Sequence, residues 1–317
     1  MSEAFWLVTS DDRRPILVDL GSQDKRAFRD DAIEITMYSV GKGEAIVISR
    51  GGRAILVDGG AGNKAKNDVL GGALAARLAP GSLRAIVASH PHRDHTNFYR
   101  VLAQRPDLFA QGAKYFDNGT QKAEDDWKRL RKSQANLPFV REAVGHQRAR
   151  DGDNRIPLGP GVEVHLVRGK TRAKSRAVQA YWSVFLFLRY RDAWMLFTGD
   201  AMKGYEKLLL PRLEDISGRA HMLKVTHHGS SDGTSPDLVT SLRPRISIVS
   251  TAKDPTHRIE KDVRERLSDS EIYATYDLKR PPPRAEDIIV RTDGRLWGVN
   301  GFEGVLFEVS TQTPALT

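Results

Sequence analysis

Three histidines and an aspartate lie close together in the segment Ser89-His90-Pro91-His92-Arg93-Asp94-His95. The segment directly follows a short, mostly apolar run, residues 83–88, that we predict as a buried strand. A strand that ends in this loop brings several neutral imidazoles and a carboxylate to one place. Such ligands suit zinc, iron or manganese better than calcium or magnesium. A surface loop rich in histidine by chance is the alternative, but the chain has only 9 histidines in 317 residues.

Three other predicted strands end in side chains of the same kind. These are Asp58 after residues 55–57, Asp200 after residues 195–199, and His227 with His228 after residues 223–226. Polar residues at several strand ends converge along one edge of a sheet, which is how α/β folds commonly build a site. The chain has no cysteine, so histidine, aspartate or glutamate must hold any metal.

The elements that position these residues follow from the apolar pattern. We predict strands at 4–8, 15–18, 33–40, 45–49, 54–57, 83–88, 114–116, 162–167, 183–190, 193–197, 221–225, 246–250, 272–275, 288–292 and 295–299. We predict helices at 67–78, 96–103, 202–210, 236–242 and 259–267, and a basic, mostly helical surface insertion over 122–150. Strand blocks alternate with helices twice, which favours two packed sheets with helices outside.

Length and composition set the class of protein. The 317 residues, 40% hydrophobic and 28% charged, are typical of a soluble globular protein. We expect an N-terminal extension at 1–32 that forms a packed hairpin, a main domain at 33–300 with the insertion near 120–150, and a C-terminal tail at 301–317. Residues 1–12 lack the features of a signal peptide and no apolar run approaches a membrane span, so we expect a cytoplasmic protein without a membrane. The net charge of +9 is consistent with a polyanionic partner such as nucleic acid, or with a solvated basic surface.

Five segments, taken in order, carry a family resemblance. They are Ser39-Val40-Gly41-Lys42-Gly43-Glu44-Ala45, Ile55-Leu56-Val57-Asp58-Gly59-Gly60, the histidine segment 89–95, Thr198-Gly199-Asp200, and Leu223-Lys224-Val225-Thr226-His227-His228-Gly229-Ser230. Over about residues 33 to 299 the chain resembles the metallo-β-lactamase superfamily, and within it the soluble hydrolase domain of the DNA-uptake protein ComEC and its stand-alone relatives. The first segment stands in for that family's Asp-Val-Gly-Gln-Gly-Asp-Ala. The resemblance implies an α/β fold, a metallo-β-lactamase-like αβ/βα sandwich of two mixed sheets with helices outside and the metal site at one edge.

The resemblance also implies roles for the polar residues. His90 and His92 would hold one metal, Asp94, His95 and His227 a second, and Asp200 would bridge the two. Asp58 would orient a loop or a ligand histidine. The implied cofactor is one or two divalent ions, with zinc the first choice and manganese the alternative. A hydroxide held between two such ions is a nucleophile at neutral pH, and the ions stabilise charge in the transition state.

One histidine of the family has no clear counterpart. The family often places a further ligand to the first metal between the histidine segment and Asp200, and the nearest candidate here is His165. His165 lies inside a predicted strand, where a lone histidine is more often structural. ComEC-like sequences commonly lack this histidine too. The first metal would then be weakly held, and occupancy by a single ion is an open alternative.

Two more histidines have two interpretations each. His228 could take part in general acid chemistry or substrate contact, or it could orient the loop by a hydrogen bond. His257 follows a predicted strand, and the family has a similarly placed histidine near the site. We expect His257 to bind a phosphate or to protonate a leaving group, with an exposed residue at a helix start as the alternative.

A basic side chain occupies every second position between residues 168 and 176. These are Arg168, Lys170, Arg172, Lys174 and Arg176. An extended chain would place all five on one side, where they would repel one another unless an anion lay across them. We interpret them as a substrate-binding stretch that follows phosphates, with a disordered basic loop as the alternative. Trp127, Tyr181 and Trp182 could stack on bases or belong to the core.

The sequence therefore predicts a metal-dependent hydrolase, a phosphodiesterase or nuclease that acts on DNA or RNA, with Asp94, Asp200, His228 and His257 in the catalytic machinery. A hydrolase of a small nucleotide, lactone, thioester or lactam is the alternative within enzymes. A binding subunit of a larger assembly with little turnover is the alternative outside them, and a nearly complete ligand set argues against it.

Overall fold

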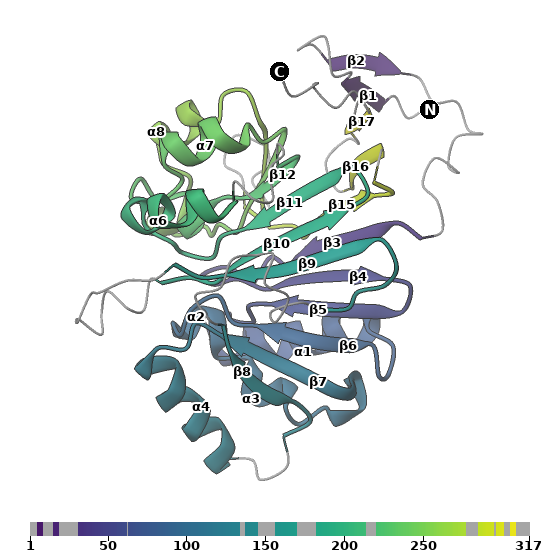
Figure 1. The fold of residues 1–317 in the computed structure, drawn as a ribbon, viewed down its shortest axis with the longest axis vertical. Helices are drawn as coiled ribbons and strands as arrows, with labels where there is room; N and C mark the ends of the chain where they lie inside the picture. Colours follow the sequence, from purple (N-terminus) through teal and green to yellow (C-terminus); the bar gives the residue numbers. More distant parts are fainter. Residues whose placement is uncertain are drawn as a thin grey trace.

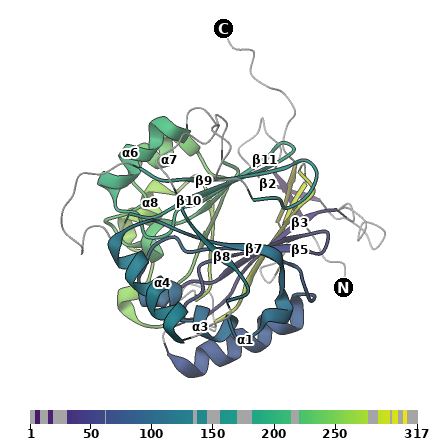
Figure 2. The same ribbon diagram turned by 60° about the horizontal axis from the view of Figure 1, so that its bottom comes forward.

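The computed structural model describes residues 5–8, 15–18, 31–61, 63–133, 137–144, 156–169, 182–213, 220–276, 285–294, 296–300 and 305–308. Two β-sheets pack face to face, and helices cover the outer face of each sheet (Figures 1 and 2). This confirms the predicted αβ/βα sandwich of two mixed sheets. No helix in these ranges is both long enough and apolar enough to cross a membrane.

The larger sheet has eleven strands within the described residues, in the order β2-β1-β17-β16-β15-β3-β4-β5-β6-β7-β8. Their bounds are β1 Phe5–Val8, β2 Pro15–Val18, β3 Ile33–Met37, β4 Ile46–Arg50, β5 Arg53–Val57, β6 Leu83–Val87, β7 Phe109–Asp117, β8 Val140–Ala143, β15 Ile288–Thr292, β16 Leu296–Asn300 and β17 Val305–Glu308. From β5 to β8 the neighbouring strands are parallel, so their carboxyl ends share one edge.

The smaller sheet has six strands within the described residues, in the order β14-β13-β12-β11-β10-β9. Their bounds are β9 Val162–Val167, β10 Phe185–Tyr190, β11 Ala193–Phe197, β12 Met222–Lys224, β13 Ile246–Val249 and β14 Glu271–Ala274. Strands β11 to β14 are parallel, and β9, β10 and β11 are joined antiparallel. The carboxyl ends of β11 and β12 therefore also share one edge.

The helices lie outside the sheets. They are α1 Lys64–Arg77, α2 Arg93–Thr96, α3 Tyr99–Leu102, α4 Gln121–Ser133, α6 Lys203–Leu213, α7 Pro236–Leu242 and α8 Lys261–Arg266, with short 3-10 turns η2 Pro106–Leu108, η5 Thr226–Gly229 and η6 Pro255–His257. Helices α1, α3 and α4 lie on the larger sheet, and α6, α7 and α8 lie on the smaller one (Figure 1). Helix α7 shows why such a helix starts where it does: the Ser235 side chain accepts a hydrogen bond from the Leu238 amide, and Pro236 occupies the first turn.

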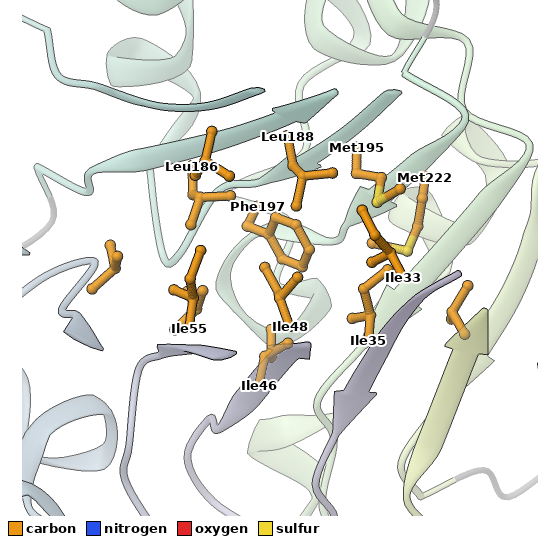
Figure 3. Close-up of a cluster of buried hydrophobic side chains, with 14 of the residues drawn as sticks. Ile33, Ile35, Ile46, Ile48, Ile55, Leu186, Leu188, Met195, Phe197 and Met222 are labelled. Carbon is orange, nitrogen blue, oxygen red and sulfur yellow. The ribbon is translucent and has the colours of Figure 1, made fainter. Parts of the chain in front are cut away.

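The main core lies between the two sheets. Isoleucines of β3, β4 and β5 face leucines of β10 and the sulfur and aromatic side chains of β11 and β12 (Figure 3). Alternate residues of each strand point inward, as Ile33 and Ile35 of β3 do, and both are fully buried. Two further apolar clusters fill the spaces between each sheet and its helices. The strands that lead into the loops at the shared edge are thus packed on both faces.

The ends of the chain extend the larger sheet. Strands β1 and β2, inside the predicted extension 1–32, form an antiparallel hairpin, and β1 pairs in parallel with β17. Strand β17 lies inside the predicted tail 301–317 and pairs with β16. The insertion near 120–150 consists, in its described part, of helix α4 and of strand β8, which pairs with β7. The helix that follows the histidine segment begins at Arg93, earlier than predicted, so Asp94 and His95 lie within its first turn.

Candidate metal centre

Four strand ends supply the candidate ligands. The loops after β5 and β6 carry Asp58 and residues 90–95, and the loops after β11 and β12 carry Asp200 and the pair His227 and His228. The first two strands belong to the larger sheet and the other two to the smaller one. The structure thus brings together, at one edge of the sandwich, residues that lie far apart in the sequence.

Asp200 is the centre of this cluster. Its Oδ2 atom lies 3.1 Å from His95 Nε2, 3.6 Å from His228 Nε2, 3.7 Å from His90 Nε2 and 3.9 Å from His227 Nε2. The Asp200 side chain is 3% exposed. Imidazole nitrogens on a shared carboxylate oxygen, away from bulk water, are the donors that a divalent transition metal prefers.

Asp58 orients the histidine segment. It ends β5 with φ of 55°, a left-handed conformation that aspartate tolerates better than most residues. Its Oδ1 accepts a hydrogen bond from the Ser89 amide at 2.7 Å, and its Oδ2 accepts one from Ser89 Oγ at 2.7 Å and one from His95 Nδ1 at 2.8 Å. The bond to Nδ1 turns His95 Nε2 toward Asp200. A carboxylate that fixes the orientation of a ligand histidine in this way is common at metal sites, and the family resemblance implied such a role for Asp58.

The same serine fixes His90. Because the Ser89 hydroxyl donates its proton to Asp58, it accepts from His90 Nδ1 at 3.0 Å, which leaves the lone pair of His90 on Nε2. That Nε2 atom lies 3.0 Å from His92 Nδ1. The two nitrogens are therefore within hydrogen-bonding distance of each other, and the two rings meet edge to face. Asp94, with its side chain 35% exposed, lies 4.0 Å from His95 Nε2 on the other side.

His227 and His228 are both held by a second partner. His228 Nδ1 donates to the Ser250 carbonyl at 3.1 Å, and His227 Nδ1 donates to Asp232 Oδ1 at 2.8 Å. Each bond leaves Nε2 for the cluster. His228 Nε2 is buried and has no hydrogen-bond partner among the described residues, whereas the His227 side chain is 23% exposed.

The electrostatics suit a bound cation. Burial, reinforced by the charge on His95, holds the pKa of His90 well below its ordinary value, and burial lowers the pKa of His228 to about 3. Both rings are therefore neutral and can act as ligands. Burial opposes the charge on His95, but Asp200 and Asp58 raise its pKa well above the ordinary value. The carboxylates thus attract positive charge into a buried place.

The donor atoms form groups that fit a divalent ion. One group is His90, His95 and Asp200, a second is Asp94, His95 and His228, and a third is Glu44, Asp58 and His95. Within each group the donor atoms lie within 4.8 Å of one another. The orphaned Nε2 of His228 in the second group is a lone pair that a metal would satisfy. The family resemblance assigned His227 to the ligands of the second metal; its Nε2 lies 3.9 Å from Asp200 Oδ2, and that of His228, a member of the second group, lies 3.6 Å from it.

The other candidate histidines lie in different surroundings. His165 pairs with Phe187 between β9 and β10, and its Nε2 atom lies 3.6 Å from Glu163 of its own strand. The described residues give no contact between His165 and the cluster. His257, by contrast, lies beside it, with its ring centroid 5.2 Å from that of His228. The expected position of His257 near the site therefore agrees with the structure.

The basic stretch lies mostly outside the described residues. Lys170, Arg172, Lys174 and Arg176 are not described, and neither is Tyr181. Arg168, at the end of the described segment, has its pKa lowered by burial. Trp127 stacks on Tyr115 with ring centroids 5.3 Å apart, and Trp182 packs at the edge of the outer core of the smaller sheet.

Sequence reasoning missed the residues that support the ligands. Ser89, Asp232 and Ser250 hold three of the histidines, and a buried pair, Glu44 and Lys224, lies against Asp200. A signal existed for Lys224, because a lysine inside the apolar run 222–225 must find a partner if that run is a buried strand. Nothing in the sequence identified that partner.

Comparison with known proteins supports the fold. Residues 38–108 match the family model of the metallo-beta-lactamase superfamily, and a search of curated proteins gave no match. The chain is similar to the metallo-beta-lactamase fold protein YhfI from Bacillus subtilis, at 13% identity over 82% of this chain and 99% of that chain, with a TM-score of 0.51. It is also similar to the short form of human tRNase Z, at 16% identity, 68% and 91% coverage and a TM-score of 0.45, and to a diphosphatase from the PhnP family, at 13% identity, 82% and 98% coverage and a TM-score of 0.47. These likenesses concern the fold, and the last two are too loose to bear on function.

Proposed function

We propose that this chain, which contains a metallo-β-lactamase superfamily domain, is a metal-dependent hydrolase that cleaves phosphodiester bonds in DNA or RNA. The observation that best supports a hydrolytic centre is the approach of four imidazole nitrogens to one oxygen of Asp200. Divalent ions bound by such a set lower the pKa of water, supply a nucleophile at neutral pH and stabilise negative charge in the transition state. We also propose that, within the superfamily, the chain belongs with the ComEC-type hydrolase domains that its sequence motifs resemble.

Different residues of the chain would bind each of the two ions. In this proposal His90 and His92 would hold one ion, Asp94, His95 and His228 would hold a second, and Asp200 would contribute to both. His227 approaches the same oxygen of Asp200 from the more exposed side. Zinc is the first choice for these donors, and manganese is the alternative.

His257 is the residue proposed to contact the scissile phosphate. Burial and the charge of Lys42 lower its pKa, so its ring is neutral at neutral pH. A neutral ring donates a hydrogen bond to a phosphate oxygen but is a poor proton donor to a leaving group. Lys42 itself forms a 2.7 Å ion pair with Asp254, three residues before His257, which places a cation at the same mouth of the site.

A cavity next to helix α2, the helix that carries Asp94 and His95, supports the proposal of a nucleic-acid substrate. It measures about 380 Å³ and lies between helices α2 and α3 on one side and α4 on the other. Its lining includes three arginines, Arg93, Arg100 and Arg129, and the stacked rings of Tyr115 and Trp127. The Tyr115 ring is buried and the Trp127 ring is partly buried, so Trp127 is the ring on which a base can stack. Arginines that can bind phosphates, next to such a ring, are usual parts of a single-strand binding surface. The net charge of +9 favours the same class of substrate.

The size of this cavity also favours a second candidate. A volume of about 380 Å³ suits a single nucleotide as well as one unit of a polymer. A phosphodiesterase for a small nucleotide is therefore the alternative within the same chemistry. The two candidates differ in how far the substrate extends beyond the cavity. A polymer would also contact the basic residues 170–176, and a small nucleotide would not.

One assay tests the proposal. The purified protein is incubated with end-labelled single- and double-stranded DNA and RNA, and with bis-p-nitrophenyl phosphate, in the presence of zinc, manganese or magnesium. We expect metal-dependent cleavage that Asp200→Asn abolishes while the fold is retained, with His165→Ala as the histidine control that keeps most activity. Cleavage that survives chelation and Asp200→Asn would overturn the metal-centre mechanism, and cleavage of mononucleotide diesters alone would favour the small-nucleotide alternative.

A further inference from the structure

Lys224 is a buried lysine inside the smaller sheet. It is the last residue of β12, in the middle of the smaller sheet, and its side chain is 0% exposed. Lysine is almost never fully buried without a partner, because the charge loses its hydration. The partners of its ammonium group therefore indicate the role of Lys224.

The ammonium group of Lys224 joins three oxygen atoms. Nζ donates to the Gly199 carbonyl at 2.8 Å, lies 2.6 Å from Glu44 Oε2 and lies 3.6 Å from Asp200 Oδ1. Asp200 Oδ1 is buried and has no hydrogen-bond partner among the described residues. The two oxygens of Asp200 thus face different charges: Oδ1 faces the lysine, and Oδ2 faces the imidazoles.

Glu44 connects this lysine to the other half of the ligand set. Its amide donates to the Asp94 carbonyl at 3.0 Å, and its carbonyl accepts from the Gly60 amide at 2.9 Å. The preceding Gly43 is packed so closely that a Cβ atom there would lie 2.5 Å from the Gly60 carbonyl oxygen and 2.7 Å from that of Asp94. Glu44 therefore cannot shift without moving the loop that carries Asp94 and His95.

We propose that Glu44 and Lys224 are positioning residues of the metal centre. The charge of Lys224 attracts Asp200 Oδ1, so that Oδ2 faces the imidazoles, where the divalent ions would bind, and Glu44 ties Lys224 to the loop of Asp94. The pair sets the spacing between the ligands from the larger sheet and those from the smaller sheet. This inference rests on the proposed function in one respect, the binding of metal at this centre.

A purely structural role would leave a different signature. A buried ion pair contributes little stability relative to neutral side chains of similar volume, whereas removal of one partner leaves an uncompensated buried charge. The double variant Glu44→Gln/Lys224→Met should therefore fold about as stably as the wild type, while each single variant should be less stable. The double variant still lacks the cation at Asp200 Oδ1, which separates positioning from folding.

The experiment measures metal affinity and metal spectra on proteins of known stability. Metal-free wild type, Lys224→Met, Glu44→Gln and the double variant are titrated with zinc against a chromophoric chelator and with cobalt(II) by visible absorption. Their thermal midpoints are measured without metal. Lys207→Met, which changes an exposed lysine on α6, is the matched control and should equal the wild type in every measurement.

We expect the double variant to recover the thermal midpoint but to bind zinc roughly 10- to 100-fold more weakly, with an altered cobalt spectrum. Wild-type affinity and spectrum in the double variant would overturn the positioning role and leave the metal centre intact. Absence of metal binding in the wild type would instead overturn the proposed function, and this inference with it. If the single variants fail to fold, the double variant alone decides the question.

Discussion

Two consecutive residues, His227 and His228, have left-handed backbone angles, with φ of 48° and 53°. For residues other than glycine this conformation costs roughly 1–2 kcal/mol each, and strain of this kind collects at functional sites. This backbone conformation allows both rings to form hydrogen bonds through Nδ1. Asp232 and the Ser250 carbonyl can each take one Nδ1–H, so that both Nε2 atoms point toward Asp200.

The two histidines should nevertheless differ in their effect on metal binding. We expect His228→Gln to lose most of one equivalent of metal, because its buried Nε2 groups with Asp94 and His95. We expect His227→Gln to lose less, because its ring is 23% exposed and lies farther from Asp200. Elemental analysis of the dialysed proteins measures this, with His165→Gln as control. Equal loss in both variants, or a larger loss for His227→Gln, would favour the assignment made from the sequence.

Among the helices and strands, the sequence predicted best those apolar runs that end in a potential metal ligand. The apolar runs ending in Asp58, in the histidine segment and in Asp200 are strands β5, β6 and β11. Parallel pairing of β5 with β6 places the first two ends at one edge of the larger sheet, whereas β11 belongs to the smaller sheet. Strand β8 and the long β7 were less predictable, since β8 has exposed and half-exposed residues and β7 an irregular register. The bond between Glu44 and Lys224 could not be predicted, because it joins segments of two sheets that only the folded chain brings together.

The hairpin of β10 and β11 is anchored to the larger sheet through Asp31. Its carboxylate accepts from Tyr190 at 2.9 Å, Arg191 at 2.8 Å and Arg50 at 3.2 Å. The hydrogen bond from Tyr190 is the main cause that lowers the pKa of Asp31 below 3.8. A lowered pKa in the folded state contributes stability that is present above pH 3.8 and is lost as the pH falls through the folded value.

Asp31→Asn should therefore reduce the stability of the metal-free protein at neutral pH, by about 1 kcal/mol or less because the side chain is partly exposed. The difference from the wild type should shrink as the pH falls from 3.8 through the lower pKa of the folded carboxylate. Urea unfolding of both proteins across this range measures the effect. A difference that stays constant in acid would show that the charge is not its source.

The cavity between α3 and α4 offers the clearest test of where a polymer binds. Arg100→Ala/Arg129→Ala removes two arginines from the cavity, and Arg172→Ala/Lys174→Ala/Arg176→Ala removes three cations from the basic stretch. For a nucleic-acid enzyme we expect both variants to bind single strands more weakly, with the salt slope reduced by about one for each phosphate that is no longer neutralised. Hydrolysis of bis-p-nitrophenyl phosphate should be almost unchanged.

Fluorescence anisotropy at several salt concentrations measures both affinity and slope. Weaker binding in the first variant alone would assign the polymer to the cavity. Wild-type binding in both variants would remove both surfaces from the proposal and favour a small nucleotide as substrate.

At the scale of the whole molecule, the candidate ligands come from both sheets, so a bound ion ties the two halves of the sandwich together. Removing metal by chelation should lower the unfolding midpoint, and zinc should restore it in a concentration-dependent way. Free zinc at 100 times its dissociation constant adds about 2.7 kcal/mol to the free energy of unfolding. Differential scanning calorimetry measures this shift, and Asp200→Asn is the control in which it should largely disappear. A midpoint that does not respond to zinc in the wild type would count against a site shared by the two sheets.

The pairing of β3 with β15 has a consequence for how the protein is made. Residues 33–37 lie in the middle of the larger sheet, yet their partners on one side are residues 288–292. On a ribosome that adds 5–20 residues each second, those partners arrive about 250 residues later, after roughly 12 to 50 seconds. Throughout that interval one side of β3 is an open edge with no strand to pair with, the kind of surface that invites association between nascent chains. We therefore expect the newborn chain, more than the finished protein, to depend on chaperones, and slower translation to lower the yield of native molecules.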